Sequence, residues 1–319
     1  MSSKRIDVHA HFLPPFYRQA LINAHHERPD GMAAIPDWSE EKALEIMEHL
    51  NIASALLSIS SPGVHFGDDR AAQTLARQVN EEGARLRDAH PDRFGWFAVT
   101  PLPDVQSAVT EASFALDVLR ADGIVVESNH HGLYLGDARL NPFYTALNER
   151  EAVMFIHPTS PSCTVCGSLG LGYPMPMLEF MFETTRTVTQ LILSGATKRF
   201  PKIRIIVPHA GAALPVLVSR VDLMIPLLEA KAPDKSPSMR AELRKLYFDL
   251  AGAPLPELLH ALFQVADPDH IFYGSDWPFT PATACRRLAD KLDTQICQDD
   301  ELLNRLMNGN ARKLFPRFA

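Results

Sequence analysis

The stretch Ser54-Ala55-Leu56-Leu57-Ser58-Ile59 is apolar or small at every position, and Ile203-Arg204-Ile205-Ile206-Val207-Pro208 is largely apolar too. A strand with one face in water would alternate between apolar and polar residues, and these stretches do not. Strands that are buried on both faces are typical of parallel sheets covered by helices. The two stretches therefore predict an α/β protein.

Six further runs have the same character, and longer stretches of helical period separate them. The predicted strands are Arg5–His9, Ile52–Ser60, Phe94–Val99, Gly123–Glu127, Ala152–His157, Ile203–His209, Leu246–Leu250 and His270–Ser275. The predicted helices are Glu40–Leu50, Arg70–His90, Val105–Ala121, Pro142–Arg150, Leu178–Lys198, Leu214–Leu228 and Leu255–Ala266, with a C-terminal helical extension at Asp299–Phe315. Eight strand–helix units in series favour a distorted (β/α)8 TIM barrel over an open sheet.

No glycine-rich phosphate loop follows any predicted strand, which argues against a nucleotide cofactor. No linker divides the chain, so residues 1–319 are predicted to form a single domain. With 46% hydrophobic and 22% charged residues, the chain has the composition of an ordinary globular enzyme. A chain of this size can bury a large core without a structural metal. Any metal that it binds is therefore expected to serve function.

The charge and hydropathy patterns of the sequence restrict the binding partners and the cellular location that we expect. A net charge of −7 without a dense Lys/Arg run argues against nucleic acid. No apolar run is long enough to span a bilayer, and the first strand begins too early to leave room for a removable signal peptide, so we expect a cytoplasmic protein. Cys163 and Cys166 form a C-x-x-C in a loop rich in Ser, Pro and Gly, which we interpret as reduced thiols.

Histidine and aspartate side chains recur where the predicted strands end. His9 and His11 are two residues apart, which places both on one face of the first strand. His157, His209 and Asp276 follow later strands directly. In a barrel all five would converge at the carboxyl-terminal mouth, where barrel enzymes keep their active sites. Imidazoles and a carboxylate suit Zn²⁺, with Mn²⁺, Fe²⁺ or Co²⁺ as alternatives.

The same residues carry a family resemblance. Asp7-Val8-His9-Ala10-His11-Phe12 resembles the opening H-x-H motif of the amidohydrolase superfamily, and His157-Pro158, Pro208-His209-Ala210-Gly211 and Gly274-Ser275-Asp276-Trp277-Pro278-Phe279 resemble its later motifs. The chain looks most like the branch of α-amino-β-carboxymuconate-ε-semialdehyde decarboxylase. Within that branch, Ser60-Ser61-Pro62-Gly63 is similar to the 6-methylsalicylate decarboxylases.

The resemblance implies that His9, His11, His157 and Asp276 ligate the metal and that His209 is an acid/base residue. Many relatives carry a carboxylated Lys at the end of the fourth strand, which bridges two metals. Here that strand ends Val125-Val126-Glu127-Ser128-Asn129-His130 without a Lys. The departure favours one divalent ion, although Glu127 could bridge a second.

Such a site supports two reactions. One is non-oxidative decarboxylation of a salicylate-like or muconate-type acid, with Asp276 as a second catalytic residue that protonates the ring carbon and with no organic cofactor. The other is hydrolysis of a lactone, ester or amide by metal-bound water; hydration of an unsaturated diacid is related. A third hypothesis is a non-catalytic barrel that only binds ligands. We predict the decarboxylase, acting on a small carboxylic acid.

Substrate contacts are harder to place. Phe12, Trp277 and Phe279 offer flat apolar surface near the motifs, and Arg186 or Arg220 offers a cationic partner for a carboxylate. The loop histidines His65, His130 and His131 are further candidates for the pocket wall. From the resemblance we also expect a homodimer or homotetramer.

Overall fold

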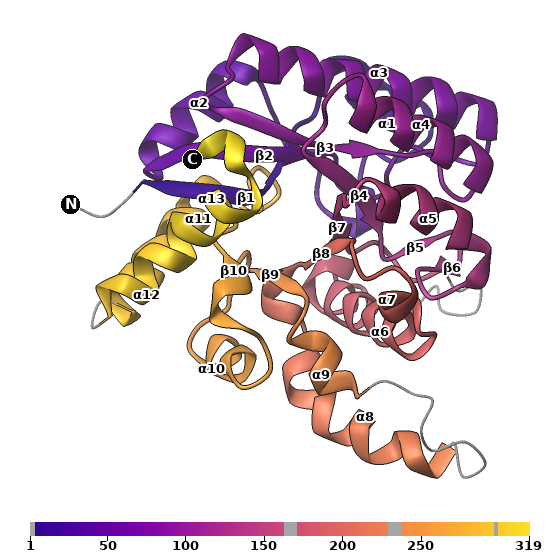
Figure 1. Ribbon diagram of the computed structural model, residues 1–319. Helices are drawn as coiled ribbons and strands as arrows, with labels where there is room; N and C mark the ends of the chain where they lie inside the picture. Colours follow the sequence, from indigo (N-terminus) through magenta and orange to yellow (C-terminus); the bar gives the residue numbers. More distant parts are fainter. Residues whose placement is uncertain (1–3, 163–170, 229–237, 297–298) are drawn as a thin grey trace.

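The computed structural model describes residues 4–162, 171–228, 238–296 and 299–319. Its centre is an eight-stranded parallel sheet with the order β1-β2-β3-β4-β7-β8-β9-β10, so strands adjacent in space follow one another along the chain (Figure 1). The strands are β1 (Arg5–His11), β2 (Ile52–Ser58), β3 (Phe94–Val99), β4 (Gly123–Glu127), β7 (Val153–His157), β8 (Arg204–Val207), β9 (Tyr247–Asp249) and β10 (Ile271–Phe272). Each predicted strand matches one of them.

The sheet closes on itself between the last strand and the first. The backbone N–H of Val8 donates to the carbonyl of Tyr273 at 3.0 Å, and the N–H of Ser275 donates to the carbonyl of His9 at 3.2 Å. These bonds join β1 to the segment that continues β10. The predicted (β/α)8 TIM barrel is confirmed, and its last strand, β10, is only two residues long.

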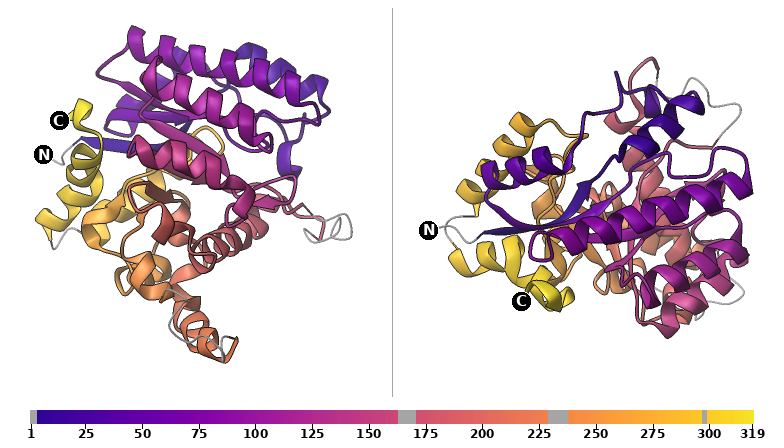
Figure 2. Two further views of the ribbon diagram at one scale, coloured as in Figure 1. Left: turned by 45° about the vertical axis from the view of Figure 1, so that its right-hand side comes forward. Right: turned by 90° about the horizontal axis from the view of Figure 1, so that it is seen from above.

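Helices surround the barrel (Figures 1 and 2). Seven lie at predicted positions: α2 (Glu40–His49), α3 (Asp69–Ala89), α4 (Val105–Asp117), α5 (Asn141–Glu149), α6 (Glu179–Leu193), α8 (Leu214–Leu228) and α10 (Glu257–Phe263). Side-chain caps fix several starts: Asp68 accepts from the N–H of Ala71, and Asp104 from that of Ser107. The predicted helix Leu178–Lys198 is interrupted at Gly195, whose φ of 77° is left-handed, and continues as α7 (Ala196–Arg199).

Several elements escaped the sequence prediction. They are α1 (Pro15–Asn23), α9 (Met239–Leu243), α11 (Ala282–Gln295) and the hairpin of β5 (Asn129–His130) with β6 (Leu133–Tyr134). Several predicted strands are also too long, and for two of them this changes where a site residue lies. β8 ends at Val207, before Pro208, which has no N–H to pair, and β10 ends at Phe272. His209 and Asp276 therefore lie in the turns after their strands, and both have positive φ.

The C-terminal extension packs beside β1 and β10 (Figure 2). The predicted helix Asp299–Phe315 consists of α12 (Asp300–Asn304), a π-helical turn at Arg305–Gly309 and α13 (Asn310–Leu314). The buried side chain of Asn310 donates to the carbonyls of Pro268 and Ile271 at 2.8 and 2.9 Å. These bonds tie the extension to the edge of β10, so it belongs to the barrel unit.

No helix among the described residues is both long and apolar enough to cross a membrane. Cys163 and Cys166, whose thiols we interpreted as reduced, lie outside the described residues. Cys285 is buried and free, and its sulfur lies 3.3 Å from the carbonyl oxygen of Ser275.

Candidate metal centre and its cavity

The barrel brings His9, His11, His157 and Asp276 together. One ligand atom from each lies within 4.8 Å of the ligand atoms of the other three, and among the described residues no other group of three or more His, Cys, Asp or Glu side chains does this. The Nε2 atoms of His11 and His9 lie 3.1 and 3.5 Å from Oδ1 of Asp276. The predicted ligand set thus forms one compact group at the carboxyl ends of the strands.

Each imidazole of the group is held through its Nδ1 atom. His9 Nδ1 lies 2.9 Å from Asp249 Oδ2, His11 Nδ1 lies 3.3 Å from the carbonyl oxygen of Ser58, and His157 Nδ1 lies 2.8 Å from that of Pro158. When Nδ1 donates to an oxygen, Nε2 carries the lone pair. This arrangement is typical of histidines that ligate metals. His9 Nε2 is moreover buried without a hydrogen-bond partner, so the group fits a divalent cation.

Asp249 was not among the predicted site residues. It is fully buried, and besides His9 it accepts the backbone N–H groups of His209 and Ala251 at 3.0 and 2.9 Å. One carboxylate therefore orients His9 and anchors the turn that carries His209. Its position at the end of the predicted strand Leu246–Leu250 is the signal that could have revealed it.

Asp276 is a carboxylate in this environment. Burial disfavours its charge, but the hydrogen bond with His11 and the nearby imidazoles of His9 and His209 outweigh burial and hold its pKa below the ordinary value. The Thr280 hydroxyl donates to Oδ2 at 2.8 Å, and the Asp276 N–H donates to the carbonyl of His9 at 2.7 Å. An ionised carboxylate whose side chain and backbone are both held by hydrogen bonds is well suited to ligate a metal.

The histidines of the site differ in whether their surroundings favour the neutral or the protonated ring. Burial lowers the pKa of His11, His157 and His209 to about 4, so these rings are neutral near pH 7 and keep a lone pair. For His9, burial also favours the neutral ring, but the charge and hydrogen bond of Asp249 prevail and raise its pKa.

His209 begins a single helical turn after β8, and its φ of 55° is left-handed. Its ring centroid lies 5.1 Å from that of His9, and its Nδ1 is buried without a hydrogen-bond partner. His209 is not in the four-residue group, but it lines the same cavity. This position beside the group agrees with a separate acid/base role.

A cavity of about 480 Å³ opens over the group and is here named the metal cavity. Its apolar wall includes Met32, Met177, Phe180, Met181 and Phe279, and its polar groups are those of Asp30, Ser60, His157, His209, Asp276 and Thr280. No Lys or Arg among the described residues lines it. A bound anion would therefore depend on a metal for its countercharge.

Of the predicted substrate residues, only Phe279 lines this cavity. Phe12 is fully buried against Trp38, because neighbouring strand residues point to opposite faces and His11 takes the inner one. Trp277 is 8% exposed and borders a separate small void. Arg186 pairs with the buried Glu183 one helical turn earlier. Arg220 is exposed on α8 and lines neither this cavity nor the one described next.

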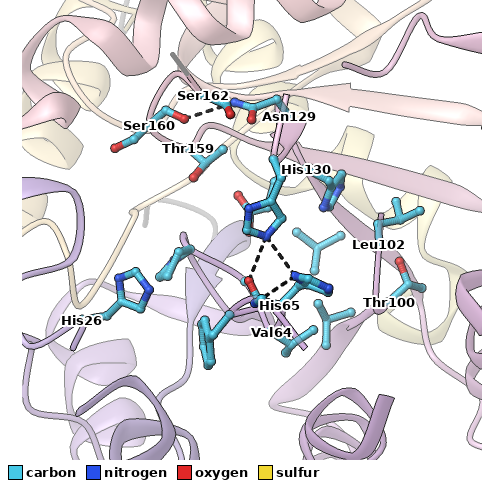
Figure 3. A pocket seen from close by; sticks show the side chains of 18 residues that line it. His26, Val64, His65, Thr100, Leu102, Asn129, His130, Thr159, Ser160 and Ser162 are labelled. Carbon is cyan, nitrogen blue, oxygen red and sulfur yellow. Dashed lines mark hydrogen bonds between the residues drawn. The ribbon is translucent and has the colours of Figure 1, made fainter. Parts of the chain in front are cut away.

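The loop histidines line a different space. His65, His130 and His131 border a second cavity of about 330 Å³, shown in Figure 3 and named here the loop cavity. Glu127 also lines it, with Oε2 3.6 Å from His157 Nδ1. Glu127 thus lies behind a ligand histidine rather than in the four-residue group.

Comparison with known proteins identifies the class to which this chain belongs. Residues 6–317 match the amidohydrolase family, and the chain belongs to that family. Two 6-methylsalicylic acid decarboxylases, from Penicillium expansum and Aspergillus aculeatus, are each 37% identical to it, over 98% of this chain and 96% of the relative. The predicted amidohydrolase resemblance is confirmed, and so is the prediction of a decarboxylase at the level of the reaction class.

Solved structures agree on the fold. An amidohydrolase crystal structure superimposes with a TM-score of 0.92 at 33% identity, covering 98% of this chain and 99% of that one. A dihydroxybenzoic acid decarboxylase from Polaromonas sp., 22% identical, has a TM-score of 0.82 over 99% of this chain and 97% of its own. That structure contains manganese and the inhibitor 2-nitroresorcinol.

Proposed function

We propose that this protein is a metal-dependent decarboxylase of a 2-hydroxybenzoic acid of the 6-methylsalicylate type. The observation that carries the proposal is a four-residue metal-binding group at the base of a cavity that no Lys or Arg of the described chain lines. A divalent ion can balance the charge of the single carboxylate that a 2-hydroxybenzoic acid carries beside its phenolic oxygen. A muconate-type diacid would bring a second carboxylate, for which this wall offers no cation.

The proposed ligands are His9, His11, His157 and Asp276, holding one divalent ion. Zn²⁺ fits three imidazoles and a carboxylate, and Mn²⁺ is the alternative favoured by the manganese in the Polaromonas structure. When bound, such an ion supplies positive charge that polarises the carboxylate and the adjacent phenolic oxygen.

The chain's own residues then manage one proton. Decarboxylation of a carboxylate consumes a proton at the ring carbon as the bond to CO2 breaks. Asp276, ionised at rest, accepts the proton of the 2-hydroxyl group and returns it to that carbon, and solvent later restores the hydroxyl proton. His209, whose ring is neutral near pH 7, is the acid/base residue that relays the replacement proton from solvent to the phenolic oxygen.

The apolar wall sets the remaining specificity. Met177, Phe180, Met181 and Phe279 surround the cavity with flexible thioethers and flat rings. A methyl group on the substrate ring would gain about 0.8 kcal/mol from full burial there. The wall therefore favours an alkyl-substituted ring over one with additional charges.

The test is CO2 release from carboxyl-labelled 6-methylsalicylate by purified protein loaded with Zn²⁺ or Mn²⁺. We expect labelled CO2 and 3-methylphenol in equal amounts, with one deuterium on the ring when the reaction runs in D2O. Turnover of a lactone or amide panel without CO2 release would instead establish the hydrolase.

Beyond the reaction, we propose that the chain forms a homo-oligomer. Met177, Leu178 and Phe182 are between 42% and 65% exposed beside the metal cavity, which supports an apolar contact surface. Light scattering on the purified protein tests this. The cytoplasmic location stays a prediction.

A further inference from the structure

The loop cavity lies beside the metal cavity but shares no lining residue with it. Thr100 and Leu102 lie on one side, Ser160 and Ser162 on another, and His65 and His130 between them (Figure 3). Two contacts form the wall between the cavities: Glu127 approaches His157, and Ser160 donates to Asp30. Nothing in the proposed reaction uses this space.

Three polar atoms around the loop cavity are buried without a hydrogen-bond partner. They are Thr100 Oγ1, Glu127 Oε2 and His130 Nε2, from the ends of β3 and β4 and from β5. Thr100 is 2% exposed and Glu127 is 5% exposed. None of the three pairs with another protein group, so residues of this wall have hydrogen-bonding capacity that the fold does not use.

The other lining residues restrict the ligand's charge. No Lys or Arg of the described chain lines the cavity. His65 and His131 are engaged with each other at 2.9 Å, and His65 Nε2 lies 2.8 Å from Asp69. Burial lowers the pKa of His130 to about 3, so that ring is neutral. An anion would therefore find no Lys or Arg here, and His26, the remaining imidazole of the lining, packs against Phe66 with ring centroids 5.3 Å apart.

The remaining wall is apolar and partly aromatic, with Val64, Phe66, Val99, Leu102 and Val125. Its volume of about 330 Å³ exceeds what one or two waters would fill and suffices for a single substituted benzene ring. Flat apolar surface next to hydroxyl, amide and imidazole groups matches an uncharged ring that carries a hydroxyl group.

We propose that the loop cavity is a second binding site, which takes an uncharged phenol. This is the chemical class of the product that the proposed decarboxylation releases, and only the source of the ligand rests on the proposed function. The phenol hydroxyl meets unpartnered polar atoms such as Thr100 Oγ1, and the ring packs on Phe66 and Leu102. The site excludes the carboxylate substrate, whose charge only the metal cavity can accommodate.

The experiment measures binding of 3-methylphenol to the metal-loaded protein by calorimetry and ligand-observed NMR, with no turnover required. Thr100→Val keeps the shape of the side chain and removes the hydroxyl, and we expect it to weaken phenol binding about 3- to 10-fold, the range for one hydrogen bond. The matched control is Thr184→Val, because Thr184 is fully buried with an equally unpartnered hydroxyl but lines neither cavity. It should leave phenol affinity unchanged.

Location and charge preference complete the test. A crystal soaked in 3-bromophenol should give a bromine anomalous peak between Phe66, Leu102 and Thr100. A peak confined to the metal cavity, ordered water alone, or a peak without binding in solution would overturn the proposal. So would tighter binding of benzoate or benzylamine than of 3-methylphenol. If 6-methylsalicylate is not decarboxylated but Thr100→Val still weakens phenol binding, the function fails and the site stands.

Discussion

The two cavities at the barrel mouth differ in how their polar atoms are supported. Around the metal cavity, Asp249 and the carbonyls of Ser58 and Pro158 hold the three histidines of the four-residue group through Nδ1, so each ring is oriented by a second group. In the loop cavity, Thr100 Oγ1 and His130 Nε2 have no such partner. Imidazoles whose orientation is fixed by a hydrogen bond at Nδ1 suit a metal ion, which demands a fixed ligand geometry. Polar atoms without a protein partner suit a small molecule that supplies hydrogen-bonding groups of its own.

Removing the carboxylate of the metal-binding group should have the largest effect. Asp276→Asn replaces an anionic ligand and proton acceptor by a neutral amide, so we expect metal to be lost on dialysis and kcat to fall by at least about 10³-fold. Elemental analysis and CO2 release measure both. The matched control is Asp30→Asn, because Asp30 lines the same cavity outside the group and should keep stoichiometric metal. Full metal retention in Asp276→Asn would contradict the ligand assignment.

His209→Gln separates chemistry from metal binding within the same cavity. Because His209 is outside the four-residue group, the variant should keep its metal while kcat falls about 10²- to 10⁴-fold, the usual contribution of a general acid or base. Metal content and initial rates are compared with the parent protein. If the metal disappears with His209, the residue is a ligand and the acid/base role must be reassigned.

Asp249→Asn tests whether the hydrogen bond between Asp249 and His9 Nδ1 contributes to metal affinity. The carboxamide keeps the size of the side chain and an oxygen for the two backbone N–H groups, but it replaces the Oδ2 atom that accepts from His9 Nδ1 by an NH2 group that cannot accept. Loss of such a partner typically weakens metal affinity about 10- to 100-fold. Competition with a chelator of known affinity gives the value. An unchanged affinity together with a native melting temperature would show that His9 needs no support.

The comparison also shows what the sequence could predict. Residue type at strand ends predicted five residues at one rim, because barrel strands all end there, and the family resemblance separated His9, His11, His157 and Asp276 from His209. Phe12 and Trp277 do not line the metal cavity. Phe12 follows His11 at the end of β1 and points to the opposite face, and Trp277 follows Asp276 in a turn, where proximity in sequence does not fix direction. Arg186 is engaged by Glu183, a pairing that helical spacing allowed but did not require. The loop cavity could not be predicted, since loop packing decides it.

The smallest expected effect is on the pH dependence of folding stability, through His130 in the wall of the loop cavity. The pKa of His130 is about 3 in the folded protein, because burial disfavours the charged ring, and close to 6.5 in the unfolded chain. Between these values the unfolded state binds more protons. The stability due to the neutral ring is therefore complete above about pH 6.5 and declines as pH falls toward 3. Between pH 7.5 and 5.5 the decline amounts to about 1 kcal/mol.

His130→Gln should remove this part of the pH dependence. Urea unfolding of parent and variant at pH 7.5 and 5.5 measures the difference, and any titration shared with the metal-site histidines cancels between the two proteins. His49→Gln is the matched control, because the His49 side chain is 65% exposed on α2 and lines neither cavity. If parent and His130→Gln lose the same free energy of unfolding over this interval, the ring is solvated rather than buried.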